Sequence, residues 1–136
     1  MATAPDIYEE IPFDECLELL KTCHFGRIAV VVDGHPIIFP INYAVDGDAV
    51  VFRTNTGAKL SGAVMGRVAF EIDGTDEVAR TGWSVVVQGV GSEITATLDR
   101  RSEQLRQLDV EPWVPGERAR WVEILAQSVT GRRLRR

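Results

Sequence analysis

The amino-acid sequence predicts a small, mainly β protein of the α+β class, with six antiparallel strands curled into a barrel and helices at its edges. Runs of alternating apolar and polar residues are separated by turn signals such as Asp33-Gly34, which is typical of antiparallel hairpins. Helical patterns interrupt these runs without the regular alternation of a parallel sheet. The 136 residues, 45% of them hydrophobic, are expected to form a single domain over residues 1–136.

The first half of the chain predicts a helix followed by a meander of strands. Leucines and cysteines at helical spacing between Pro12 and Gly26 predict a helix over residues 13–23. Turn signals at Asp33-Gly34 and at Asp46-Gly47-Asp48 then separate strands. These strands are expected at residues 27–32, 35–44 and 49–54.

The second half predicts a helix-bearing connection, further strands and one polar helix. Residues 55–65 are expected to form a loop leading into a short helix, and residues 73–81 a polar loop. The expected strands are 67–72, 82–93 and two separate pieces at 121–125 and 129–134, and the expected helix is 98–108.

Charge and hydropathy exclude several classes of partner. A formal net charge of -5 argues against a nucleic-acid clamp or a protein that binds anionic lipid, so we expect neither nucleic acid nor membrane as a partner. The apolar runs are too short to span a bilayer, and residues 1–10 lack the features of a signal peptide, which predicts a cytoplasmic location. Four arginines among the last five residues are interpreted as a solvated basic tail in preference to an anion-docking site.

The cysteines and histidines predict no metal site. Cys16 and Cys23 are interpreted as core thiols, and no pair with His24 or His35 has zinc spacing. A thiol nucleophile at Cys23 is disfavoured because side chains of sequence neighbours rarely face each other. His35 is expected on an exposed turn.

Two clusters have the composition of a ligand site. Arg53 and Thr54 end a strand, Gly57 follows, and Lys59 stands in the first turn of the next helix, a combination that suits a phosphate group. A cap and a solvated lysine would explain the same residues. The second cluster, residues 40–43, places an amide on a barrel strand, where it can recognise a planar heterocycle or simply face outward.

The order of these pieces resembles the pyridoxamine 5′-phosphate oxidase-like family of flavin-binding split β-barrels, in particular its short nitroimidazole-reductase branch. The resemblance rests on residues 25–29, 39–43, 52–54 with Lys59, and 82–89, and it extends over about residues 13–134. It implies a homodimer with flavin mononucleotide (FMN) held between the subunits. The residues it implies for cofactor binding are Pro40, Ile41, Asn42 and Tyr43 along the ring, Arg53, Thr54 and Lys59 at the phosphate, Phe52 beside them, Trp83, Ser84 and Gln88 at the interface, and Trp113 over the pocket.

The resemblance implies an FMN-dependent oxidoreductase that acts on an unidentified small molecule, with no catalytic residue assigned. Tyr43 is a candidate proton donor. Pyridoxamine phosphate is a disfavoured substrate, because Ala58 stands where those oxidases carry a basic residue and residues 132–135 lack their histidine. The alternatives are a deazaflavin-dependent reductase, whose acidic coenzyme tail the basic terminus would accommodate, a non-catalytic flavin or haem binder, and a barrel that binds no cofactor.

Overall fold

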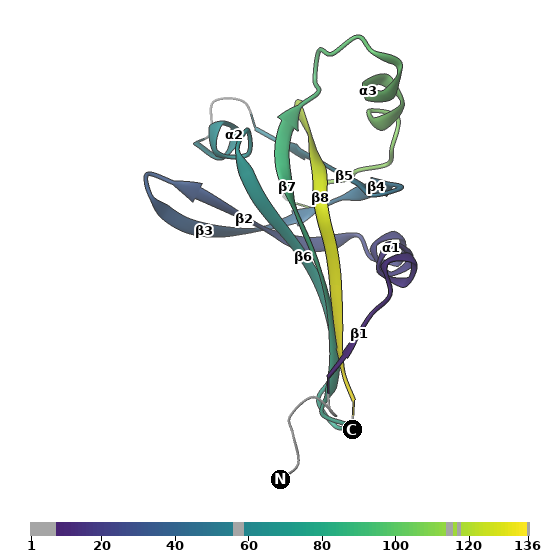
Figure 1. Cartoon of the computed structure of the whole chain (residues 1–136). Helices are drawn as coiled ribbons and strands as arrows, with labels where there is room; N and C mark the ends of the chain where they lie inside the picture. Colours follow the sequence, from purple (N-terminus) through teal and green to yellow (C-terminus); the bar gives the residue numbers. More distant parts are fainter. Residues whose placement is uncertain (1–7, 56–58, 114–115, 117, 136) are drawn as a thin grey trace.

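The protein is described here from a computed structural model covering residues 8–55, 59–113, 116 and 118–135. Its strands form one antiparallel sheet that curls into a split barrel, with three helices at its edges (Figure 1). The order across the sheet is β3-β2-β6-β7-β8-β5-β4, and β1 pairs with the far end of β8. The predicted mainly β barrel with flanking helices is therefore confirmed.

The strands and helices have the following bounds. The strands are β1 (Tyr8–Glu10), β2 (Phe25–Val32), β3 (His35–Asn42), β4 (Ala44–Asp46), β5 (Ala49–Thr54), β6 (Arg67–Asp76), β7 (Thr81–Glu93) and β8 (Arg120–Leu134). The helices are α1 (Phe13–Thr22), α2 (Lys59–Ala63) and α3 (Arg100–Leu105).

The core lies on the concave side of the sheet because the strands alternate in burial. On β2, Ile28 and Val30 are buried whereas the neighbouring Arg27, Ala29 and Val31 are more accessible. The same alternation continues on β6 and β7, so one continuous core forms between the curled strands and α1. A second, smaller cluster lies beneath α3.

The barrel is split where β3 approaches β5. β3 is hydrogen-bonded only to β2 in the described sheet, and it contacts β5 without pairing to it. Between β3 and β4 the chain turns at Tyr43, whose backbone N–H donates to the carbonyl of His24 at 3.0 Å. This seam between β3 and β5 leaves side chains of both strands facing a common space.

The sheet differs from the predicted one in several strands. The predicted loop at 73–81 is instead the end of β6, a four-residue turn and the start of β7, which together form a long arm in the lower half of Figure 1. The two predicted pieces at 121–125 and 129–134 are one strand, β8. Gln88 pairs with Ser128 and Gly89 with Ala126, so Gln127 forms a bulge that resets the alternation and hides the continuity. The predicted strand 35–44 divides at Tyr43, and β1 was not predicted.

Candidate functional site

A pocket opens at the seam of the barrel. It has a volume of about 370 Å³, within the range of small-molecule sites. We call it the seam pocket, and its lining residues come from β3, β5, the connection after β5, α2 and the loop before β8: Phe39, Pro40, Ile41, Asn42, Phe52, Arg53, Thr54, Asn55, Leu60, Pro112 and Arg118. The structure thus brings together the two clusters that the sequence singled out, residues 40–42 and 52–54.

Arg53 holds the loop before β8 against the pocket. Its Nε donates to the carbonyl oxygen of Arg118 at 3.0 Å, and its Nη1 donates to that of Val110 at 3.3 Å. The guanidinium also lies 5.1 Å from the ring centroid of Trp121, a cation–π contact. Nη2 donates to no described residue, so both of its N–H groups can contact a ligand while Arg53 positions the loop.

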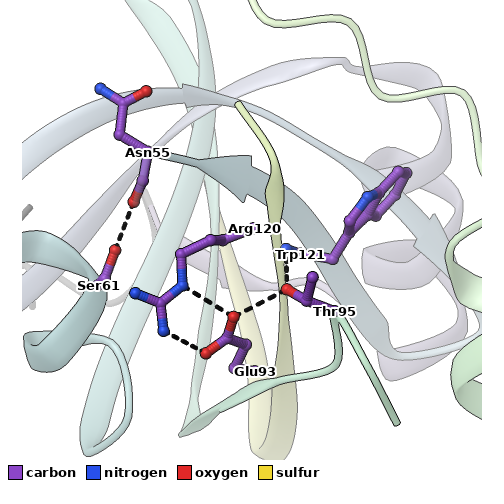
Figure 2. A network of polar contacts seen from close by, with 6 residues as sticks. All are labelled: Asn55, Ser61, Glu93, Thr95, Arg120 and Trp121. Atoms are coloured by element: carbon purple, nitrogen blue, oxygen red, sulfur yellow. Dashed lines mark hydrogen bonds and ion pairs between the residues drawn. The ribbon is translucent and has the colours of Figure 1, made fainter. Parts of the chain in front are cut away.

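The neighbouring wall of the pocket is fixed by polar contacts after β5. The Ser61 hydroxyl of α2 donates to the carbonyl oxygen of Asn55 at 2.6 Å, as Figure 2 shows. The Asn55 side-chain oxygen in turn accepts from Arg118. These bonds tie α2 and the loop before β8 to the end of β5, where Thr54 is buried.

A second polar network holds the start of β8, the strand that pairs with β5. Arg120 makes a two-point ion pair with Glu93, and the Thr95 hydroxyl donates to the same carboxylate at 2.8 Å (Figure 2). The backbone N–H of Trp121 donates to Thr95 Oγ1 at 2.8 Å. Because of these donors, chiefly Arg120, the pKa of Glu93 is lowered to about 2.

Asn42, at the end of β3, is a polar side chain of the pocket with an unsatisfied hydrogen-bond donor. Its Oδ1 accepts a hydrogen bond from the backbone N–H of Trp113 at 2.8 Å. Its Nδ2 is buried and has no hydrogen-bond partner among the described residues. A buried donor without a partner costs stability, so this N–H₂ group has the chemistry of a ligand contact.

The remaining phosphate-site residues are only partly described. Lys59 begins α2, as predicted, but the position of its side chain lies outside the described part of the structure. Gly57 and Ala58, which the sequence placed in the same turn, also lie outside the described residues.

Tyr43 belongs to the core. Its side chain is only 1% exposed and its hydroxyl donates to the carbonyl oxygen of Leu20 at 2.7 Å. Burial raises the pKa of this hydroxyl above its usual value. The structure therefore gives the Tyr43 side chain a packing role and does not support the expected proton donation. The expected contact of the strand's main chain at Tyr43 with a flavin ring stays a prediction.

Ser84, Gln88 and Trp83 lie on β7, away from the seam pocket. Ser84 and Gln88 point to the outer face of the sheet, opposite the buried Val85 and Val87. Trp83 faces the other way and packs so closely on Gly74 that a Cβ there would lie 2.5 Å from its Nε1. Strand alternation thus prevents Trp83 from sharing one surface with Ser84 and Gln88.

Trp113 does not line the seam pocket either. Its indole stacks on Phe25, with ring centroids 5.0 Å apart and planes at 6°. It lines a second pocket of about 480 Å³, which the sequence did not predict. We call this the acidic pocket: Leu20, Lys21, Cys23, His24, Asn42, Tyr43, Ala44, Val45, Asp109, Glu111 and Trp113.

Several pocket residues were not singled out from the sequence. Arg118, Asp109 and Glu111 belong to a polar stretch whose position over the barrel depends on contacts with β3 and β5. Two prolines that flank Trp113 were the available signal for a structured loop there. His24 lines the acidic pocket, whereas His35 begins β3 and is exposed, as expected.

Two arginines of the basic terminus form ion pairs within the chain. Arg133 forms ion pairs with Glu9 and Glu15, and Arg135 pairs with Glu9 at 3.0 Å. In the part of the chain that the structure describes, no group of three metal-ligating side chains is found. The same residues contain no helix long and apolar enough to cross a membrane.

Comparisons with known proteins agree with this geometry. The model of the family described as pyridoxamine 5′-phosphate oxidase matches residues 12–133. The uncharacterized protein Rv0080 of Mycobacterium tuberculosis is 35% identical over 131 residues, covering 92% of this chain and 84% of that protein.

Solved structures share the whole fold. A FAD-binding protein from Mycobacterium smegmatis is 36% identical and superimposes with a TM-score of 0.77, covering 93% of this chain and 98% of that one. A putative pyridoxamine 5′-phosphate oxidase from Corynebacterium glutamicum is 28% identical with a TM-score of 0.78, covering 95% and 99%. The family model matches nearly all of the chain, and the relatives share its split-barrel fold. The protein therefore belongs to the pyridoxamine 5′-phosphate oxidase family of split β-barrels, which includes flavin-binding proteins.

Proposed function

We propose that the chain is a flavin-dependent oxidoreductase that binds FMN in the seam pocket and acts on a small molecule. The observation that carries the proposal is the convergence of residues 40–42 of β3 with residues 52–54 of β5 on one pocket. Edge-strand backbone, an amide and a guanidinium there match the planar ring and the phosphate of a flavin nucleotide.

The residues present fit such a cofactor. The buried Asn42 Nδ2 lacks an acceptor, and flavin rings offer carbonyl oxygens and ring nitrogens. The apolar side chains of Phe39, Ile41 and Leu60 line the same pocket, which suits a flat aromatic ring. Arg53 and Thr54 would hold the phosphate, with Lys59 from the start of α2 as the proposed third contact.

A bound flavin supplies the redox chemistry in this family, and the protein supplies binding, orientation and exclusion of water. In this chain, Asn42 would orient the ring from the end of β3, where Oδ1 is already fixed by Trp113. Arg53 would combine a ligand contact with its hold on the loop before β8. No residue is assigned here as a proton donor.

FMN is proposed over FAD because the phosphate contacts proposed in the seam pocket form one compact set around Arg53. The 36% identical relative from Mycobacterium smegmatis is a FAD-binding protein, which makes FAD the competing cofactor. Assignment to the nitroimidazole-reductase branch remains a prediction.

A homodimer is proposed from the uncovered outer face of the sheet. Ser84, Gln88 and Val86 of β7 lie on this face beside the exposed Leu125 of β8. Ile38 of β3 is 65% exposed on the same side as Asn42 and Pro40, since residues two apart share a face of a strand. If a second copy packed on this face, Ser84 and Gln88 of one subunit would lie near the flavin that the other subunit holds at β3.

The test is a set of equilibrium titrations of the purified full chain with FMN, FAD, a deazaflavin coenzyme and haem, followed by desalting and absorption spectra. We expect FMN to be retained most tightly and to be lost in Arg53→Ala but not in the matched Arg100→Ala, which alters an exposed arginine of α3 outside the seam pocket. Retention of FAD or deazaflavin alone would replace the cofactor, and retention of none would overturn the flavin proposal.

Redox activity is tested separately on the flavin-loaded protein. Reoxidation of the dithionite-reduced flavin by a quinone and by a nitroaromatic acceptor should be faster than dissociation of the flavin. Tight flavin binding without electron transfer to either acceptor class would favour the non-catalytic carrier over the oxidoreductase. Sedimentation equilibrium tests the dimer, and a monomer that binds flavin fully would contradict an interface site.

A further inference from the structure

The positive charge of Arg53 is not neutralised by any carboxylate of the described residues. Arg27, Arg120 and Arg133 are likewise only partly exposed, and each of them forms an ion pair with a carboxylate. Arg53 has no such partner in the described chain. Its guanidinium contacts two backbone carbonyls and one aromatic ring, which leave its charge in place. Arg53 therefore keeps its attraction for an anion in the seam pocket.

The aromatic ring against Arg53 belongs to Trp121, and the register of the sheet places it there. Arg53 of β5 lies directly opposite Trp121 of β8, so the two side chains share one face of the sheet. The guanidinium carbon is 5.1 Å from the ring centroid, which is within the range of a cation–π contact. The ring thus restricts the guanidinium while Nε and Nη1 donate to the carbonyls of the loop before β8.

The position of Trp121 is itself fixed by contacts outside the pairing of β5 with β8. Its backbone N–H donates to the Thr95 hydroxyl oxygen at 2.8 Å, and that hydroxyl donates to Glu93 (Figure 2). Its carbonyl oxygen accepts from the backbone N–H of Ile94 at 2.8 Å. The indole packs against the small apolar cluster beneath α3. The ring is therefore held before any ligand arrives, which lowers the entropy that binding would cost.

We propose that Trp121 is a positioning residue for phosphate recognition in the seam pocket. It holds the guanidinium of Arg53 in the orientation that leaves both N–H groups of Nη2 for the phosphate of the ligand. Trp121 is not among the residues that line the seam pocket, so it acts through Arg53. This inference rests on the proposed function, because the phosphate is that of the proposed flavin nucleotide.

The first test compares FMN with riboflavin, which has the same ring but no phosphate. Both are titrated into the full chain, Trp121→Leu and Trp121→Phe. We expect Trp121→Leu to weaken FMN about fivefold, as the loss of a partly desolvated cation–π contact does. Riboflavin affinity should change by less than about twofold, because riboflavin has no phosphate for Arg53 to contact. Trp121→Phe keeps a ring face and should restore most of the FMN affinity.

Leu105→Ala controls for a general loss of packing. Leu105 is buried in the same cluster beneath α3 but makes no hydrogen bond or ring contact with Arg53. We expect this variant to unfold at a lower urea concentration and to keep the ratio of FMN to riboflavin affinity. An equal fall of that ratio in Leu105→Ala and Trp121→Leu would overturn the positioning role.

The second test follows the Nε–H signal of Arg53 by nuclear magnetic resonance, assigned with Arg53→Ala. The ring current of Trp121 should shift this signal, and Trp121→Leu should remove the shift. Inorganic phosphate and FMN should each move the signal in the unaltered chain, and phosphate should do so more weakly in Trp121→Leu. An unchanged Nε–H signal or an unchanged FMN-to-riboflavin ratio in Trp121→Leu would overturn the inference. Binding of phosphate at Arg53 without any flavin would overturn the flavin proposal alone, and binding of neither would overturn both.

Discussion

The backbone N–H of Trp113 donates to Oδ1 of Asn42 at 2.8 Å, and this bond joins the loop before β8 to the edge strand β3. The oxygen and the nitrogen of the Asn42 amide therefore have different roles. Oδ1 positions a loop, while the buried Nδ2 is left for an acceptor that the described chain does not supply. Because the two atoms can be altered separately, the assignment to a ligand can be tested directly.

Asn42→Asp keeps an acceptor for Trp113 and removes the Nδ2 donor. We expect the variant to remain folded and to lose flavin affinity by about 1–3 kcal/mol, the usual cost when a buried hydrogen bond loses its donor. Flavin fluorescence titration measures this loss. Asn55→Asp is the control, because it places the same new charge in the seam pocket without touching Nδ2. Equal losses in both variants would show that charge, and not the Nδ2 donor, is responsible.

Arg53→Lys tests the hold of Arg53 on the loop before β8. Lysine keeps the charge but cannot donate at once to the carbonyls of Arg118 and Val110 while lying over Trp121. We expect the free energy of unfolding to fall by about 2 kcal/mol, measured by urea denaturation. Arg67→Lys, on the exposed face of β6, should change it by less than about 0.5 kcal/mol. A stable Arg53→Lys protein would show that the loop is held by other contacts.

Local turn chemistry was sufficient to predict the first hairpin. The Asp33-Gly34 pair adopts positive φ angles of 51° and 78°, and Val32 pairs with His35, so the turn and its register follow from two residues. β5 occupies the predicted residues because its buried apolar run is bounded by a glycine turn and a polar connection. The family resemblance led us to expect residues 40–42 and 52–54 at one cofactor site. The seam pocket, which both segments line, is consistent with that expectation.

Features that depend on distant contacts could not be predicted in the same way. β1 is a three-residue acidic strand that pairs with β8 near Arg133, and nothing local marks it as a strand. The bulge at Gln127 breaks the alternating pattern of β8. The acidic pocket lies between α1, the end of β3 and the loop containing Asp109 and Glu111. Asn42 and Arg53 hydrogen-bond to this loop although they are far from it in the sequence.

The Glu93–Arg120 pair predicts a specific dependence of stability on pH. The pKa of Glu93 is about 2 in the folded protein, below its ordinary value, because Arg120 and Thr95 donate to the carboxylate. A lowered folded-state pKa stabilises the fold above the unfolded-state pKa and stops doing so as pH falls through the folded-state value. The contribution should therefore disappear between about pH 4.5 and pH 2.

Glu93→Gln removes this contribution. We expect it to lower the free energy of unfolding by about 1–2 kcal/mol at pH 7, because a charge-assisted network is lost. The free energy of unfolding should also depend less on pH between about pH 4.5 and pH 2. Urea denaturation at a series of pH values measures both effects. The control is Glu103→Gln, an exposed carboxylate of α3, which should leave the curve unchanged. If the free energy of unfolding of Glu93→Gln fell with pH as steeply as that of the unaltered protein, the titrating group would be another residue.

The absence of room for a Cβ at Gly91 predicts a strong destabilisation by alanine. Gly91 of β7 donates its N–H to the carbonyl of Gly66 at 2.9 Å, and a Cβ on Gly91 would lie 1.3 Å from the carbonyl oxygen of Val64. Val64 is buried, so that oxygen cannot move aside without shifting the end of α2 and the pocket residues it carries. We expect Gly91→Ala to cost more than about 3 kcal/mol of unfolding free energy. Gly62→Ala is the matched control, because nothing lies within 4 Å of its Cβ position and alanine favours a helix such as α2, so stability should hold or rise by up to about 1 kcal/mol. If thermal and urea denaturation gave the two variants the same stability, β7 and the end of α2 would not be in contact as the structure shows.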